Sequence, residues 1–211
     1  NLVHLGDKIE LVATPSEGYV FVGWKLRDGT VITEVTFHLT ITEDIEIQAL
    51  FEPEVARIGN TSYHTLEDAL DNAKAGDIVI LVTDYEMSRD AIVPRDVLLL
   101  LPFAEHDTVG YTESGFNPDG DNTNGIPSLF RTLTIPKNVT LSINGTVMVN
   151  AMTGRPVAGP IVQDISGGYS RIILHGKIDV NDGGLLDVFG KVEGTGMIEA
   201  FDGAEVGDLY V

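Results

Sequence analysis

The most chemically suggestive segment of this 211-residue chain is a loop rich in Asp and Asn at residues 117–125. Its oxygen-bearing side chains alternate as Asn117, Asp119 and Asp121, which is the ligand spacing in the first half of a calcium-binding loop. The bidentate Glu expected near the twelfth position of such a loop is replaced by Ser128. Glycine and proline in the same segment are typical of a solvated turn. We therefore interpret the loop as a plain turn, with a calcium site at these three residues as the alternative.

Paired carboxylates are the second candidate chemistry, because two acids at a suitable separation can hydrolyse a glycosidic bond. With 32 acidic residues in 211, chance groupings are expected, and no spacing selects a pair or a basic partner for a lyase reaction. The sequence therefore assigns no catalytic residue. The acids considered are Asp164, Asp179, Asp182, Asp187, Glu193 and Glu199, and the arginines are Arg131, Arg155 and Arg171.

The positions of the histidines and of the single tryptophan indicate structural roles for these residues. Trp24 is either a platform for stacking a sugar ring or a core residue, and its place within an apolar strand pattern favours the core. The absence of cysteine excludes disulfides, zinc ribbons and thiol catalysis, and we expect no cofactor apart from the calcium alternative. The five histidines show no ligand spacing and are interpreted as strand-face or loop residues: His4, His38, His64, His106 and His175.

The charge balance restricts the partners. Thirty-two acidic against 13 basic residues give a net charge of −19, which repels nucleic acid and anionic lipid surfaces. The longest strongly apolar run, Val97–Leu101, is too short to span a membrane. The chain begins at Asn1 without a methionine, so we expect that a preceding segment has been removed.

Residues 1–52 carry the alternating apolar pattern of half-buried strands, as in Ile9, Leu11 and Ala13. The dipeptide Asp28-Gly29 predicts a tight hairpin turn. We predict an independent antiparallel β module over this range, followed by a short acidic linker at residues 53–54. Its core is expected to contain Tyr19 or Phe21, together with Trp24, Phe37 and Phe51.

One helix is predicted, at residues 65–75. Thr65 and Asp68 have the spacing of a capping box, and Gly76 is expected to end the helix in a left-handed conformation. The helix should cover the open end of the fold that follows. Its apolar face combines residues three and four positions apart: Leu66, Ala69, Leu70 and Ala73.

Residues 55–211 otherwise consist of short apolar segments separated by Gly and Asn. The heptapeptides at 143–149, 174–180 and 188–194 are weakly similar to one another. Short strands with tight corners favour a solenoid over antiparallel hairpins, and about five or six rungs fit after the helix.

The N-terminal residues resemble a known module, the divergent InlB-type B-repeat of Gram-positive surface proteins. The resemblance implies a small β-grasp-like, extracellular unit that works as a spacer or interaction module. The residues that carry it, within 5–52, are Gly6-Asp7, Leu11-Val12-Ala13-Thr14-Pro15, Gly18-Tyr19-Val20-Phe21-Val22-Gly23-Trp24, Phe37 and Ala49-Leu50-Phe51.

Residues 63–84 resemble the opening of right-handed parallel β-helix proteins of the pectate-lyase-like superfamily, in which an amphipathic helix caps the first coil. This resemblance implies a fold and transfers no catalytic residue. The expected fold class is therefore all-β, with a β-grasp-like antiparallel module at 1–52 and a right-handed parallel β-helix with one N-terminal capping helix at 55–211. The pattern of short strands is unbroken up to the C-terminus, which predicts that the β-helix continues in a longer protein. Any end-to-end dimer of this chain is then expected to reflect an exposed last rung of the β-helix.

These features predict a non-enzymatic, extracellular part of a surface protein from a Gram-positive-type bacterium, secreted or attached to the cell wall. Its role is adhesion, interaction or spacing, with glycans or proteins of the cell wall or host as partners. The alternative is a fragment of a carbohydrate-active β-helix enzyme, either a lyase or a glycoside hydrolase. Sugar grooves commonly use aromatic platforms, and residues 55–211 contain no tryptophan, which favours the first interpretation.

Overall fold

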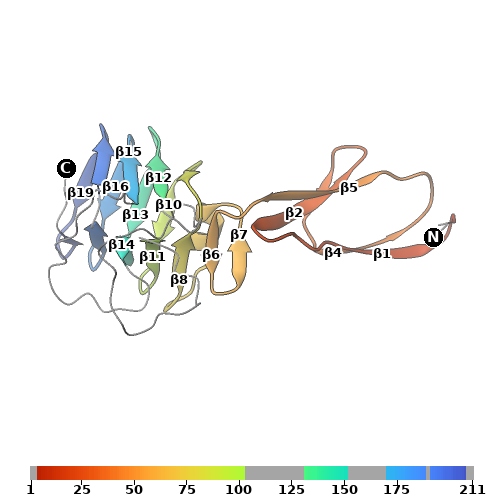
Figure 1. Ribbon diagram of the computed structural model, residues 1–211, viewed down its shortest axis with the longest axis horizontal. Coiled ribbons are helices and arrows are strands. Elements are labelled where there is room, and N and C mark those ends of the chain that lie inside the picture. Colours follow the sequence, from red (N-terminus) through yellow and green to blue (C-terminus); the bar gives the residue numbers. More distant parts are fainter. Residues whose placement is uncertain (1–3, 103–130, 152–169, 189–190, 208–211) are drawn as a thin grey trace, which may run out of the picture.

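The structure is a computed structural model that describes residues 4–102, 131–151, 170–188 and 191–207. Its regular structure is almost entirely β-strand, and the only helix in these ranges is α1 (Leu66–Asn72). The predicted all-β class is therefore confirmed. Figure 1 shows an elongated molecule, with a narrow N-terminal module at one end and a broader stack of strands at the other.

Two small antiparallel sheets form the N-terminal module (residues 4–53). One sheet pairs β1 with β4, and the other has the order β3-β2-β5. Exposed and half-buried side chains alternate along β1 and β4, as predicted, because successive strand residues point to opposite faces. The strands are β1 (Lys8–Val12), β2 (Tyr19–Leu26), β3 (Val31–Ile32), β4 (Thr36–Thr40) and β5 (Ile47–Pro53).

Trp24 is the centre of the module's core. It is 7% exposed, its indole N–H donates to the carbonyl oxygen of Glu34 at 2.9 Å, and its ring lies 5.2 Å from that of Phe21. The predicted core role of Trp24 is confirmed, and Phe21 and Phe37 are half-buried. The prediction for Phe51 was wrong, since it is 39% exposed. Its strand is at the edge of the three-stranded sheet, so no further strand shields the ring that contacts Phe21.

The predicted helix is present, and it is shorter than expected. Thr65 caps it by accepting the backbone N–H of Asp68 at 3.1 Å, which confirms the predicted N-cap. The helix ends at Asn72, because Ala73 adopts an extended conformation (ψ 140°). Gly76 has a φ of +90° and lies in the following turn, so it does not end the helix as predicted.

Both α1 and a β-hairpin cover the first rung of the strand stack (residues 78–206). Leu66 and Leu70 of α1 are 0% and 1% exposed and belong to the core of the stack. The hairpin of β6 (Ala56–Ile58) and β7 (Thr61–Tyr63) pairs antiparallel with the edge of β8 (Ile78–Leu81). The helix covers apolar side chains, whereas only another strand satisfies the backbone groups of a sheet edge.

The strand stack consists of three parallel sheets. Each strand from β8 on pairs with the strand three places later in the chain, giving β8-β11-β14-β17-β20, β9-β12-β15-β18 and β10-β13-β16-β19. In the described residues this makes four rungs of three strands and the start of a fifth. The further strands are β9 (Tyr85–Glu86), β10 (Ala91–Val93), β11 (Leu98–Pro102), β12 (Thr132–Ile135), β13 (Thr140–Ile143), β14 (Thr146–Ala151), β15 (Arg171–Leu174), β16 (Lys177–Val180), β17 (Leu185–Val188), β18 (Lys191–Gly194), β19 (Met197–Ala200) and β20 (Glu205–Val206).

The interior of the stack is built from aligned columns of aliphatic side chains. The parallel register places Leu141 beside Ile178, and Ile178 beside Ile198 of the next rung. Leu133 and Ile172 form a corresponding pair on a second sheet, and both are 0% exposed. Alternate residues of each strand therefore fill the core, and the others form the outer faces that are available for function.

Gly176 at a corner of the stack leads to our first prediction. A Cβ atom at this position would collide with the backbone oxygens of Val139 and Pro136 in the rung below. Since backbone cannot move aside as a side chain can, Gly176→Ala should lower the free energy of unfolding by about 3 kcal/mol. Gly29→Ala is the control, because its site is open and only its φ of +88° opposes alanine, at about 1 kcal/mol. Urea unfolding of both variants measures the difference, and equal losses would contradict the packing argument.

Candidate functional site

The three residues of the calcium alternative, Asn117, Asp119 and Asp121, lie outside the described residues, and so does Asp164. The predicted plain turn and its calcium-binding alternative both stay untested expectations. Within the described ranges, no three His, Asp or Glu side chains are placed to hold a metal ion together.

The structure brings two of the candidate acids together on the outer face of one sheet. Asp179 on β16 and Glu199 on β19 are partners in the parallel register. Each forms an ion pair with the Nζ atom of Lys177 at 2.7 Å, so their nearest oxygens are at most about 5.4 Å apart. Hydrogen bonding to Asp179, and then to Glu199, raises the pKa of the Lys177 ammonium. The two acids are therefore joined through a lysine that stays charged.

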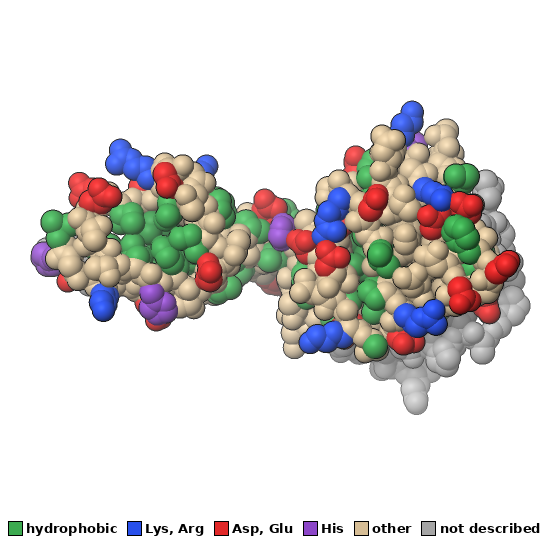
Figure 2. All heavy atoms as spheres, turned by 180° about the vertical axis from the view of Figure 1, so that it is seen from behind, with side chains coloured by type: hydrophobic (Ala, Val, Ile, Leu, Met, Phe, Trp, Pro, Cys, Tyr) green, Lys and Arg blue, Asp and Glu red, His purple; other side chains and the backbone are tan. Residues whose placement is uncertain are grey.

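A second charged row lies on the neighbouring sheet. Glu193 on β18 lies 2.7 Å from Lys191 Nζ and 3.6 Å from Arg171 Nη1. The hydrogen bond from Lys191 lowers the pKa of Glu193, so this carboxyl stays ionised and is a poor proton donor. Acidic and basic side chains are interspersed over the stack in the view of Figure 2. The remaining described candidates, Asp182 in an exposed turn and half-buried Asp187, are on different elements from these rows.

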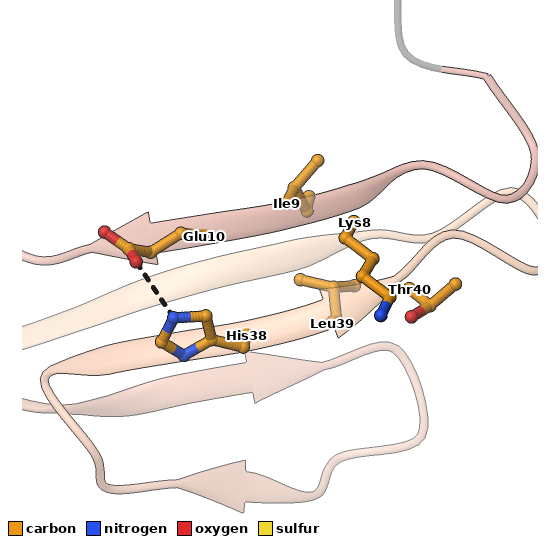
Figure 3. A pocket seen from close by; sticks show the side chains of 6 residues that line it. All are labelled: Lys8, Ile9, Glu10, His38, Leu39 and Thr40. Carbon is orange, nitrogen blue, oxygen red and sulfur yellow. Dashed lines mark hydrogen bonds and ion pairs between the residues drawn. The ribbon is translucent and has the colours of Figure 1, made fainter.

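A hollow of about 360 Å³ lies over the β1–β4 pair. Figure 3 shows its one specific contact, between Nε2 of His38 and Oε2 of Glu10 at 2.9 Å. Thr40 lies beside Lys8 in the register, away from His38, so its hydroxyl is not placed for activation by the imidazole. The His38 and Glu10 side chains are 70% and 56% exposed, and water weakens such a pair. The hollow is an open surface feature, and the exposed position of His38 agrees with its interpretation as a strand-face residue.

The most deeply buried carboxylate in the described residues is Glu67 of α1, which the sequence did not single out. It is 1% exposed and belongs to the first turn of the helix. Its Oε2 accepts from the Tyr85 hydroxyl at 2.6 Å, and its Oε1 accepts from the Ser88 N–H at 2.6 Å and the Ser88 hydroxyl at 3.1 Å. The Arg89 N–H, at 3.3 Å, completes the set. These donors saturate the carboxylate, so Glu67 joins α1 to the first corner of the stack.

Tyr85 provides a prediction for alkaline pH. Burial, and then the hydrogen bond to Glu67, raises the pKa of the Tyr85 hydroxyl well above its usual value of about 10. The folded state thus favours the protonated phenol, whose stabilising effect is complete below about pH 10 and is lost as the pH rises further. Between pH 9 and pH 11, the wild type should lose more free energy of unfolding than Tyr85→Phe, which has no phenol to ionise there. Parallel loss in both proteins, followed by urea unfolding, would contradict this assignment.

Comparison with known proteins identifies only the N-terminal part. Residues 1–55 match the family model described as a divergent InlB B-repeat domain, which supports the resemblance noted for residues 5–52. No curated protein and no solved structure matches the chain. Among the helices of the described ranges, none has the length and apolar character needed to cross a membrane.

Proposed function

We propose that this chain is a non-enzymatic, extracellular part of a bacterial surface protein. The N-terminal module would act as a B-repeat-type spacer or contact unit. The strand stack would be a right-handed parallel β-helix that presents its outer faces to glycans or proteins of the cell wall or host. The observation that carries this proposal is the match of residues 1–55 to the divergent InlB B-repeat model.

The pairing of the stack supports the β-helix part of the proposal. Three parallel sheets built from every third strand require a chain that winds in one direction around a shared core. Connections between parallel strands of one sheet are right-handed in nearly all proteins, which favours the right hand here. An elongated stack also suits a spacer, since each rung adds length without needing distant contacts.

The state of the candidate acids favours binding over catalysis. The upper limit of about 5.4 Å on the distance between the nearest Asp179 and Glu199 oxygens is compatible with the short carboxyl separation of a retaining glycosidase. Such an enzyme places the scissile glycosidic bond between its two carboxyls. Here the Lys177 ammonium lies 2.7 Å from an oxygen of each acid and occupies the space between them. The carbohydrate-active alternative would therefore have to displace this lysine at the Asp179–Glu199 pair.

Surface location is tested by protease treatment of intact cells of the bacterium that encodes the chain. We expect loss of antibody-detected chain from intact cells while a cytoplasmic marker survives. Protection of the chain until the cells are lysed would overturn the extracellular part of the proposal.

Binding and catalysis are separated with the purified chain. We expect retention on isolated peptidoglycan or on a host-glycan array, and no product from polygalacturonate or other plant and microbial polysaccharides. Turnover that disappears in Asp179→Asn and persists in the exposed-turn variant Asp182→Asn would instead establish the enzyme alternative.

A further inference from the structure

The chain passes from the N-terminal module to the strand stack without leaving a backbone ladder. On the module side, β5 pairs with β2 as far as Pro53, which lies opposite Tyr19. The next residue continues this ladder, because the N–H of Glu54 donates to the carbonyl oxygen of Gly18 at 2.8 Å. Residue 54 is thus tied to the module.

On the stack side, the adjacent residue is already part of the next ladder. The N–H of Val55 donates to the carbonyl oxygen of Tyr63 at 2.8 Å, and its own carbonyl oxygen accepts from Val82 at 2.9 Å. The Val55 side chain is 7% exposed and belongs to the core of the stack. A single peptide bond therefore separates the residue held by the module from the residue held by the stack.

The backbone at this joint has little freedom. Peptide bonds are planar, so motion between the two parts must come from the φ and ψ angles of the residues beside the bond. The ring of Pro53 fixes its φ, and it also restricts Glu52 to extended conformations. The torsions left to form a hinge are those around Glu54 and Val55.

An ion pair holds the first of these residues. The Glu54 carboxylate accepts from Nε of Arg57 at 2.8 Å and from Nη2 at 2.9 Å, which is a bidentate contact with fixed directions. The Glu54 side chain is 6% exposed, so water cannot readily replace the guanidinium. Because Glu54 is bonded through its backbone to Gly18, the residue before β2, and through its side chain to Arg57 of β6, it connects the two parts directly.

We propose that this joint is locked, that the N-terminal module and the strand stack move as one rigid body, and that the Glu54–Arg57 pair is the lock. Parts of one chain that meet at a small interface ordinarily move relative to each other. Here only Glu54 and Val55 lie between the end of β5 and the start of β6, and the backbone of both is hydrogen-bonded. The inference concerns the purified chain and holds whether or not the protein is exported.

The test is backbone ¹⁵N relaxation on the full 211-residue chain. If the joint is locked, residues of β1–β5 and of β8–β19 should share one overall rotational correlation time. A flexible Gly/Ser insertion of about five residues between Glu54 and Val55 provides the reference for a free joint. There the smaller module should tumble about twofold faster than the stack.

Glu54→Gln removes the charge that holds the guanidinium, and it should move the module's correlation time at least halfway towards that of the insertion variant. Arg57→Lys, which keeps the positive charge and loses the bidentate contact, should move it in the same direction and is the second variant if Glu54→Gln folds poorly. Glu52→Gln is the matched control, since it makes the same chemical change at an exposed neighbouring position and should leave the wild-type value unchanged.

Two results would overturn the proposal. Separate correlation times for module and stack in the wild type would show that the joint is free. Wild-type coupling in both Glu54→Gln and Arg57→Lys would show that the ion pair is not the lock.

Discussion

Replacement of Leu70 by aspartate is expected to unfold the strand stack at neutral pH and room temperature. Leu70 is 1% exposed and packs with Leu66 in the core cluster that includes the interior of the first rungs. Truncation of such a leucine alone removes about 2–5 kcal/mol of stability, and burial of a carboxyl without a partner adds several more. The total is comparable with the whole stability of an ordinary domain, about 5–15 kcal/mol. Leu66→Asp should have the same effect.

Circular dichroism and urea unfolding measure this result, and Asn72→Asp is the control. Asn72 is exposed on the same helix, so a carboxylate there stays in water and should cost less than about 1 kcal/mol. The module and the stack can also be followed separately, since Trp24, the single tryptophan, reports only on the module. A cooperative, wild-type-like transition for the Leu70 variant would show that the helix is not needed to close the stack.

Replacement of Glu67 by alanine is expected to lower the free energy of unfolding by about 3–5 kcal/mol. The substitution leaves the Tyr85 hydroxyl and the Ser88 and Arg89 N–H groups without their shared acceptor. A buried donor that loses its partner costs about 1–3 kcal/mol, and water entering the vacated space offsets part of the sum. Glu67→Gln should lose less, because one amide oxygen still accepts from this set.

Glu86→Ala is the matched control for Glu67→Ala, because Glu86 is an exposed glutamate on the adjacent strand β9. It should change stability by less than about 0.5 kcal/mol. A double-mutant cycle with Tyr85→Phe isolates the Glu67–Tyr85 contact. Additive effects of the two substitutions would mean that the short bond between them contributes nothing measurable.

The two outer rows of charge account for part of the acidic surface without implying a site. On β16 and β19, and again on β15 and β18, basic side chains form ion pairs with acids of the same strand or the adjacent rung. The register stacks Asp179 on Glu199 and Arg171 on Lys191, and like charges directly opposite each other repel. Lys177 offsets the first repulsion and Glu193 offsets the second, because each contacts both members of the pair. Ion pairing within the sheet therefore accounts for the acid pairs in these rows without a catalytic role.

The sequence by itself determined the class of the elements and the capping of the helix. The alternating pattern along β1 and β4 indicates which face of each strand is buried. The spacing of Thr65 and Asp68 indicates which side chain caps the helix. Both are local properties, since they depend on residues a few positions apart in one element. The helix end was misplaced for the same reason, because Ala73 leaves the helix to let the chain reach β8, and no local signal requires this.

The tertiary structure alone decided the contacts that matter most for stability and function. Glu67 meets Tyr85 and Ser88 across 18 and 21 residues of chain, and its burial follows from the packing of α1 on the first rung. Lys177 meets Glu199 only because rungs stack in register, which turns a possible acid pair into an ion-paired row. A periodic pattern specifies which side of an element is covered, whereas the identity of the residue opposite depends on how the elements are assembled in space.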